Sequence, residues 1–554
     1  MSIKPQKRRL KAGIAGGAAL AIALTGCVES QRDGDGDAPA DDVNSTFIFA
    51  ASSDPSGLDP AFANDGETFR ISRNIFEGLV GVEPGGADPA PLLATEWEAS
   101  EDGTSYTFQL QDGVTFHDGT EFNSEAVCAN FERWYNWEGL PAAESMSYYY
   151  GNLFQGNRGD ENALYESCSA DEELVATVNL TRPFTGFIPA LSLPAFAMQS
   201  PSAMEEYGAD DMGGTEDAPQ YSEYAEAHPS GTGPFTFDSW SPGSEVVLQA
   251  NPDYWGEQGQ VQEVVFRVID DPTARRQALE AGDIDGYDLV APADTEALES
   301  AGYNIMQRDP FTILYLGFNQ QIEELADPLV REAITHAIDR EALVSQVLPE
   351  GTEVASQFIP PVVNGYNDDV TTYDHDPELA RDLLEQAGYA DGFELDFNYP
   401  VNVSRPYMPN PEQIFTALSS QLEEVGITVN PIASEWVEYI DLMQGSPDHG
   451  IHLLGWTGDY NDTDNFIGVF FGSYSNEWGF EDDELFSALA DARTLTDPDE
   501  ANSVYQDINQ QIAEAMPGVP LAHPAPSLAF NERVESYPAS PVNDEVYNEI
   551  VLSE

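Results

Sequence analysis

Two short polar motifs hold the side chains best suited to bind a charged small molecule. The first, Gly455–Tyr460 (GWTGDY), directly follows the apolar run Ile451–Leu454. Polar residues just past the end of a buried strand tend to face a cleft, so Asp459 is a candidate partner for a cationic group. The second, Ser404–Asn410 (SRPYMPN), carries Arg405, whose guanidinium can hold a carboxylate with two parallel hydrogen bonds.

Each of these residues also has an ordinary interpretation. Asp459 follows a glycine and could be a turn residue, and Arg405 could be a surface arginine. Tyr407 and Trp456 could pack in the core rather than line a cleft. The motifs alone therefore leave a binding role and a structural role both open.

The sequence offers little for metal binding or catalysis. Asp448, His449 and His452 form a loose group of possible metal ligands, but the chain contains no HExxH motif, and we expect a structural or solvated role for them. No Gly-x-Ser-x-Gly elbow is present. Carboxylate pairs are so abundant in this acidic chain that they do not indicate glycosidase chemistry. We expect no enzyme activity, no metal and no cofactor.

The first 26 residues predict export. Basic residues precede an apolar run, Ile14–Leu24, that is too short to span a bilayer, which needs roughly 20 apolar residues. The run ends in Leu24-Thr25-Gly26-Cys27, which resembles the lipobox of bacterial lipoproteins and implies acylation of Cys27. The alternative is an ordinary secretory signal with a chance cysteine. Residues 27–45 are acidic and rich in Gly and Asp, which predicts a flexible tether.

Charge excludes several functions. The three lysines, Lys4, Lys7 and Lys11, all lie in the predicted signal together with Arg8 and Arg9, so the mature chain has 16 arginines against 98 acidic residues and a net charge of −82. Without lysine there is no P-loop and no Schiff-base chemistry. Nucleic acids and anionic head groups would be repelled. We infer a salt-adapted or alkaline-adapted protein, because about 1 M salt shortens the Debye length to roughly 3 Å.

The remaining cysteines, Cys128 and Cys168, predict one disulfide in an exported chain, and two separate buried thiols are the alternative. The rest of the chain predicts mixed α/β structure without a transmembrane span. Ordered structure should begin at the apolar strand Thr46–Ala50. Helices are predicted over residues 125–137, 327–348, 377–388 and 411–426, and the last two have an Asp or Asn cap, then proline, then a terminal glycine.

An ordered set of motifs resembles the bacterial extracellular solute-binding proteins of family 5, the peptide- and nickel-binding receptors of ABC importers. The match covers nearly everything after the tether and is closest to the dipeptide-binding branch. Its motifs lie at residues 93–103, 106–108, 113–119, 231–235, 251–255, 281–285, 330–340 and 455–460.

This resemblance implies two α/β lobes of the type II periplasmic-binding-protein fold, with the extra subdomain of the peptide-binding group and a ligand cleft between the lobes. Lobe I is expected over residues 46–308 with 518–554, and lobe II over 309–517. No bond would be made or broken. The molecule would be a monomer, tethered at the outer face of the cell membrane, that delivers its ligand to an ABC permease and ATPase.

The resemblance also implies residue roles. In the dipeptide-binding branch the aspartate matching Asp459 pairs with the α-ammonium of the ligand, and the arginine matching Arg405 holds its carboxylate. Tyr407 and Trp456 would line the cleft beside the backbone and side chains of Gly455, Thr457 and Tyr460. One departure is Asp462-Thr463, where this branch often has Asp-Pro.

The function expected from these roles is capture of short peptides, dipeptides above all. Fixing both charged termini fixes length, because extended chain spans at most about 3.3–3.6 Å per residue. The alternatives are another solute bound by the same fold (an oligopeptide, oligosaccharide, opine or nickel chelate) and, with less support, an exported hydrolase.

Overall fold

Short polar caps followed by proline set the start of many helices in this chain. The computed structural model describes residues 45–216 and 218–553, so the predicted signal, Cys27 and almost all of the predicted tether lie outside the described residues. The side chains of Asp376 and Asn410 accept hydrogen bonds from the backbone N–H groups of Leu379 and Gln413, as an N-cap does. Proline then occupies the first turn, where its missing N–H costs nothing.

The two capped helices follow the prediction closely. α12 (Pro377–Gln386) and α13 (Pro411–Glu424) end two residues before Gly388 and Gly426. These glycines take φ values of 96° and 97°, which other residues rarely adopt. The helix predicted over 327–348 is instead two helices, α10 (Pro328–Ala337) and α11 (Arg340–Val347). The break arises because Asp339 caps α11.

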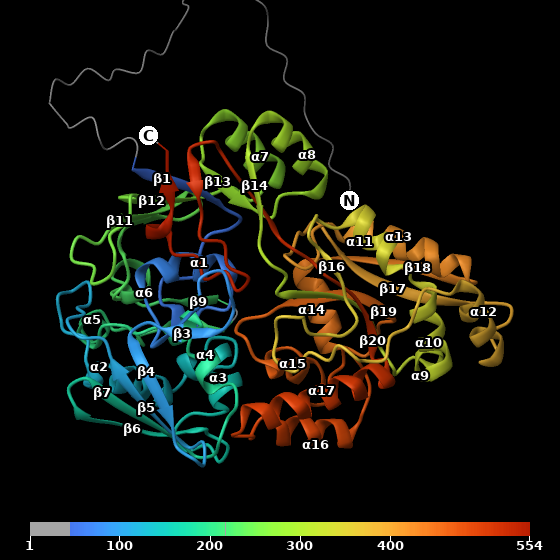
Figure 1. The fold of residues 1–554 in the computed structure, drawn as a ribbon, viewed down its shortest axis with the longest axis horizontal. Helices are drawn as coiled ribbons and strands as arrows, with labels where there is room; N and C mark the ends of the chain where they lie inside the picture. Colours follow the sequence, from blue (N-terminus) through green and yellow to red (C-terminus); the bar gives the residue numbers. More distant parts are fainter. Residues whose placement is uncertain (1–44, 217, 554) are drawn as a thin grey trace, which may run out of the picture. The chain divides into compact units, whose positions relative to one another are not determined.

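Lobe I is built on a mixed sheet of seven strands among the described residues (Figure 1). In order across the sheet these are β10 (Phe235–Ser241), β11 (Glu245–Ala250), β12 (Glu263–Val268), β1 (Thr46–Ala51), β13 (Gly286–Asp288), β21 (Ser527–Phe530) and β14 (Asn304–Gln307). β1 begins at Thr46, as predicted, and pairs in parallel with β12 and β13. The lobe also contains α1 (Gly66–Ile75), α7 (Pro272–Ala281) and α8 (Pro292–Ala301).

A second sheet in the N-terminal half forms the extra subdomain. Its strands, in order, are β4 (Ala94–Ala99), β5 (Ser105–Leu110), β7 (Val175–Leu180) and β6 (Tyr165–Glu172), accompanied by α2 (Ser124–Tyr135) and α3 (Tyr148–Phe154). The Cys128–Cys168 disulfide joins α2 to β6, with Cα atoms 5.3 Å apart. Short helices follow at α4 (Phe187–Ala190), α5 (Pro201–Glu206) and α6 (Glu223–Ala227). The disulfide therefore fastens the helix of this subdomain to its sheet.

Lobe II is built on a six-stranded sheet within the described range. In order across the sheet the strands are β16 (Glu353–Val354), β20 (Gly518–His523), β15 (Thr312–Phe318), β19 (Ile451–Thr457), β17 (Phe393–Val401) and β18 (Ile427–Glu435). All seven residues of β15 are buried. Besides α10 to α13, the lobe contains α9 (Glu323–Ala326), α14 (Trp436–Gly445), α15 (Ile467–Phe471), α16 (Asp483–Ala492) and α17 (Pro498–Ala515).

Small two-stranded ribbons complete the described structure. They are β2 (Val80–Val82) with β3 (Pro89–Pro91), β8 (Gly213–Thr215) with β9 (Ala218–Gln220), and β22 (Val534–Ser536) with β23 (Val551–Leu552). Over the part of the chain that is described, no helix has the length and apolar character needed to cross a membrane.

The chain passes twice between the two large sheets. The first passage lies between β14 and β15, from Gln307 to Thr312. We predicted the return at 517/518, but β20 pairs with β15 through backbone hydrogen bonds and its residues are largely buried, so it belongs to lobe II. The chain therefore leaves this sheet after His523, and the bounds of the two lobes stay a prediction.

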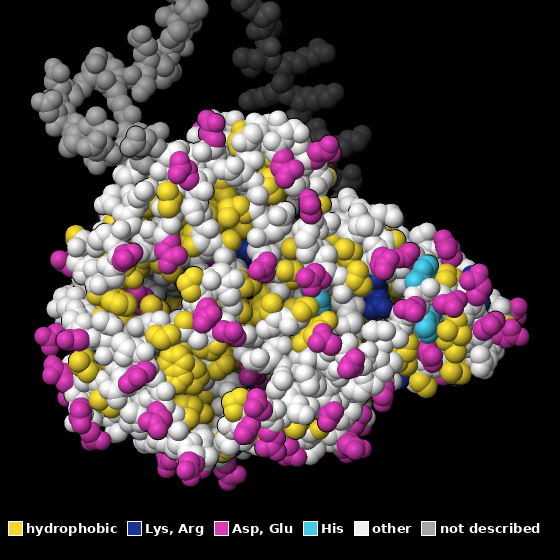
Figure 2. Space-filling view, in the orientation of Figure 1, with side chains coloured by type: hydrophobic (Ala, Val, Ile, Leu, Met, Phe, Trp, Pro, Cys, Tyr) yellow, Lys and Arg dark blue, Asp and Glu magenta, His cyan; other side chains and the backbone are white. Residues whose placement is uncertain are grey.

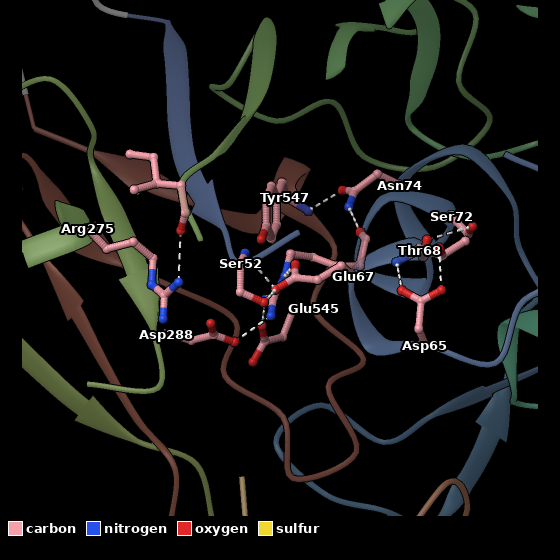
Figure 3. A network of polar contacts seen from close by, with 12 residues as sticks. Ser52, Asp65, Glu67, Thr68, Ser72, Asn74, Arg275, Asp288, Glu545 and Tyr547 are labelled. Atoms are coloured by element: carbon pink, nitrogen blue, oxygen red, sulfur yellow. Dashed lines mark hydrogen bonds and ion pairs between the residues drawn. The ribbon is translucent and has the colours of Figure 1, made fainter. Parts of the chain in front are cut away.

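A buried group of charges lies beside the first passage. Arg308 forms an ion pair with Glu545 at 2.5 Å and approaches Asp288 at 3.4 Å. Asp288 and Glu545 face each other in Figure 3, and Arg70 of α1 also pairs with Asp288. Burial alone would raise the pKa of Asp288, but Arg70 and Arg308 hold it below its usual value. The first passage therefore starts at Arg308, which the carboxylates of Glu545 and Asp288 hold in lobe I.

Candidate functional site

The GWTGDY motif continues from the central strands of lobe II. β19 lies between β15 and β17, and its last residue, Thr457, pairs with Thr312 of β15. The two glycines of the motif are required by close packing. A Cβ atom at Gly455 would lie 2.3 Å from the carbonyl oxygen of Ile313, and one at Gly458 would lie 2.2 Å from the ring of Phe311. Tight packing therefore fixes the backbone that leads into Asp459.

The structure brings the two polar motifs together. The ring of Tyr407 lies against Gly455, where a Cβ atom would be only 2.4 Å from the Cδ2 atom of Tyr407. Tyr407 is buried in the core of lobe II, and burial raises its pKa above the usual range. Tyr407 thus serves as the packing link between the Arg405 segment and the GWTGDY motif.

Asp459 is held by one donor on each carboxylate oxygen. The hydroxyl of Tyr149, in α3, donates to Oδ1 at 2.8 Å, and Nδ2 of Asn465 donates to Oδ2 at 3.0 Å. The backbone N–H of Asp459 donates to Oδ1 of Asn465 at 2.8 Å. Burial raises the pKa of Asp459 to about 6. Among the described residues Asp459 has no ion pair within 4.0 Å, although the charge of Arg73 acts on it from farther away and lowers its pKa.

Arg405 is a cation in lobe II that has no carboxylate partner among the described residues. Its guanidinium lies over the ring of Trp436, the first residue of α14, at 4.1 Å from the ring centre. Its Nε is buried without a hydrogen-bond partner, and no carboxylate within the described residues pairs with it. Burial lowers the pKa of Arg405. Arg331 and Arg340 also lack a carboxylate partner, but their side chains donate to backbone carbonyl oxygens, whereas no such bond is found for the side chain of Arg405 among the described residues.

The other predicted site residues occupy different surroundings. Trp456 packs against the second core of lobe II, in edge contact with Phe470, and its Nε1 is buried without a partner. Tyr460 packs against the core of the extra subdomain. Trp456 therefore keeps a donor available near the motif, and Tyr460 contributes to the contact between lobes.

Sequence reasoning missed three of these neighbours. Tyr149 lies 310 residues before Asp459 in the chain, and only the run of three tyrosines at 148–150 hinted at an unusual surface. Trp436 was not singled out, although it directly follows a strand end. Asn465 could have been found, because it comes six residues after Asp459 in a polar loop.

The family is decided by the extent of the sequence match. A sequence model of the bacterial extracellular solute-binding proteins, family 5 (middle), matches residues 88–478. The chain belongs to this family. Its relatives include the dipeptide-binding protein of Escherichia coli K12, which is 29% identical over 525 residues covering 92% of this chain and 94% of that protein. The heme-binding protein A of Haemophilus influenzae is 28% identical over 95% of this chain and 96% of its own length.

Solved structures of similar proteins share the fold. A periplasmic binding protein of Helicobacter pylori in complex with the peptide STSA is 27% identical, covers 92% of this chain and 98% of its own, and superposes with a TM-score of 0.74. A dipeptide-binding protein from Pseudoalteromonas, at 24% identity, has a TM-score of 0.76. The chain therefore has the two-lobed fold of periplasmic binding proteins of the peptide-binding group.

Asp462-Thr463, where the sequence departs from the family pattern, lies at the start of a short helical turn. The side chain of Asp462 accepts from the backbone N–H of Asp464 at 2.8 Å and caps the short helical turn Thr463–Asn465. Burial, with Asp464 close by, raises the pKa of Asp462 to about 7. This turn carries Asn465, the amide that holds Asp459.

The histidine group near β19 makes internal contacts. Both ring nitrogens of His449 lie within 3.1 Å of backbone carbonyl oxygens, of Ser446 and Glu477. His452 lies 3.2 Å from the carboxylate of Glu477, which also accepts from the hydroxyl of Tyr315 at 2.6 Å. No cluster of three or more metal-ligating side chains is found among the residues that the structure describes.

Proposed function

We propose that this family 5 protein captures short peptides, with dipeptides as its preferred ligands, by their two charged ends. The observation that carries the proposal is a pair of opposite charges in lobe II that both lack an ion-pair partner. Among the described residues Asp459 has no cation, and Arg405 no carboxylate, within the 4.0 Å of an ion pair, yet both are largely withdrawn from water. An unpaired buried charge is costly, so an oppositely charged ligand group would be strongly favoured at each.

A zwitterionic peptide meets both requirements. Its α-ammonium donates to Asp459, whose carboxylate is already oriented by Asn465 and Tyr149. Its carboxylate accepts from the guanidinium of Arg405, which Trp436 holds flat. Side-chain positions of the peptide would be met by water, which tolerates variety. The result is selection for length and free termini with little selection for sequence.

The protein would act as the receptor of an ABC importer. A lipid-modified Cys27 would hold it at the outer face of the cell membrane, because the strongly acidic chain cannot bind anionic head groups. Closure of the lobes would present the loaded molecule to the permease, and no bond would be made or broken. The names of several relatives support the ligand class, since they are dipeptide- or di/tripeptide-binding proteins.

A thermal-shift panel in high salt tests this proposal. The panel holds free dipeptides, tripeptides, longer peptides, an oligosaccharide, an opine, a nickel chelate and heme. A ligand raises stability by RT ln(1 + [L]/Kd), so binding is read from the melting temperature. We expect the largest shift with free dipeptides. If only a non-peptide solute raises the melting temperature, the ligand is that class of solute and not a peptide. Loss of the solute over time would indicate a hydrolase.

A further inference from the structure

A turn of the extra subdomain caps a helix of lobe II. The backbone N–H of Thr185 donates to the carbonyl oxygen of Arg493 at 2.8 Å. The hydroxyl of Thr185 lies 2.9 Å from the same oxygen, 3.0 Å from that of Leu495 and 3.2 Å from that of Ala492. These carbonyls lie at and just beyond the C-terminus of α16, which ends at Ala492. A residue 308 positions away along the chain thus closes the end of this helix.

The contact matters because carbonyl groups at the C-terminus of a helix need outside hydrogen-bond donors. The last carbonyls of an α-helix have no partner within the helix and need a donor from a side chain, from water or from another segment. Here the donor belongs to the other lobe. Ala492 at the end of α16 also accepts from the backbone N–H of Leu495, but the carbonyl oxygens of Arg493 and Leu495 must turn to water when the lobes separate, so the hydrogen bonds of Thr185 contribute only to the closed molecule.

The neighbours of Thr185 make the contact tight. The guanidinium of Arg493 lies over the ring of Phe184, 5.4 Å from its centre, and forms an ion pair with Asp464 at 2.9 Å. On the other side of Thr185, a Cβ atom at Gly186 would lie 3.3 Å from the carboxyl carbon of Asp462. The hydroxyl of Thr185 meets the carbonyl oxygens of Ala492, Arg493 and Leu495, none of which is a predicted ligand-binding residue.

We propose that Thr185 is a closure latch: by capping α16 across the lobes it sets how much of the protein is closed, and so tunes ligand affinity without touching ligand. The part of this proposal that concerns affinity rests on the proposed peptide-binding function. The part that concerns closure does not, because the latch is made entirely by the protein.

The test compares two threonine-to-valine substitutions in the full chain. Thr185→Val removes the hydroxyl, keeps the branched shape and retains the backbone donor. Thr236→Val is the matched control, because its hydroxyl also donates to a backbone carbonyl, that of Gln249 at 3.3 Å, but within lobe I. Two readouts are taken for each protein: hydrogen exchange of the backbone amide at position 185 without ligand, and the affinity for alanyl-alanine by calorimetry.

Loss of one such hydrogen bond corresponds to about a three- to tenfold change in an equilibrium. We therefore expect Thr185→Val to speed exchange at position 185 and to raise the Kd by about this factor, with Thr185→Ser close to the wild type in both. Thr236→Val should leave both readouts within about twofold, allowing for the intrinsic variation between such bonds.

Three results would overturn the latch. They are a wild-type Thr185 amide that exchanges as fast as an unstructured one, a Thr185→Val variant that matches the wild type, and an equal effect of Thr236→Val. If no peptide binds the wild type, the proposed function fails, while the exchange comparison still decides whether the latch exists.

Discussion

At the scale of single residues, the site is defined by what its charges lack. Most arginines of the described chain that are buried have partners: Arg308 pairs with Glu545, and Arg331 donates to carbonyl oxygens at the ends of α9 and α17. Arg405 has neither a carboxylate nor a carbonyl partner for its side chain, and Asp459 has only neutral donors. These two opposite charges in one lobe suit a ligand that carries both charges.

Replacing Asp459 by asparagine tests its role directly. The substitution keeps size and removes charge, so the ligand's ammonium would be left without a counter-charge. We expect dipeptide affinity to fall by about 2 kcal/mol or more, roughly 30-fold, in a calorimetric titration. Asp448→Asn is the control, because Asp448 is an exposed acid just before β19. Equal affinities of the Asp459 variant and the wild type would remove Asp459 from the site.

The raised pKa of Asp459 predicts a pH dependence of binding. Only the ionised carboxylate pairs with an ammonium, and burial holds the pKa of the empty site at about 6. Affinity should therefore fall about tenfold from pH 7 to pH 5, while the ammonium, with a pKa near 8, stays charged. The stability of the unliganded protein depends on pH in the opposite direction. Because folding raises the pKa of Asp459, its protonated carboxyl stabilises the folded state at low pH, and this stabilisation is lost as the pH rises through about 6.

The matched control for this pH effect is the Asp459→Asn variant, measured by the same titration at both pH values. Asp462 and Glu77, whose pKa values burial raises to about 7, are retained in it. The variant should lose the tenfold change. A variant that keeps it would assign the effect to those other carboxyl groups.

At the scale of helices and strands, features set by a few adjacent residues could be predicted from the sequence, and features set by distant contacts could not. The starts of α12 and α13 depend on four or five adjacent residues that begin with Asp-Pro or Asn-Pro, and so they were predicted nearly to the residue. The split at Asp339 was missed because the apolar face continues across the break. The pairing of β20 with β15, some 200 residues earlier in the chain, could not be predicted from local sequence.

The candidate site likewise has parts that local sequence predicts and parts that only the folded chain reveals. The strand end that presents Asp459 follows from the apolar run before it, and the family motif directs attention to Arg405. Their partners Tyr149 and Trp436 come from other elements, so only the folded chain brings them there. The contact between Tyr407 and Gly455 is also invisible to periodicity, because it depends on how two loops pack.

The disulfide gives a prediction for the extra subdomain. It closes a loop with a sequence separation of 40 residues between α2 and β6. In the chain-entropy account such a loop contributes about 4 kcal/mol. A Cys128→Ala/Cys168→Ala double variant should lose about that much stability in urea unfolding, and reduced wild type should behave alike. A loss under about 1 kcal/mol would show that the unfolded chain is not restrained by this link.

At the scale of the whole molecule, charge is the dominant feature. Acidic side chains are spread over the face shown in Figure 2, where few basic ones are seen. Several arginines are in the interior instead, including Arg275, Arg308 and Arg331, so the surface is even more acidic than the composition indicates. Such a surface repels itself at low ionic strength.

Stability should therefore rise with salt. Between about 0.1 M and 1 M sodium chloride the Debye length falls from roughly 10 to 3 Å, which removes most repulsion between surface charges. We expect a clear rise in melting temperature over this range. Sucrose at matched osmolality serves as the control for general solute effects. A melting temperature that stays constant or falls with salt would contradict the inferred salt adaptation.

The proposed function depends above all on recognition of both charged ends of a short peptide. A calorimetric titration of the wild-type chain with alanyl-alanine, its N-acetylated form and its C-amidated form measures this recognition. We expect the free dipeptide to bind and either cap to cost at least about 2 kcal/mol of binding free energy, because each cap strands one buried charge. Equal binding of all three peptides would contradict the proposed function.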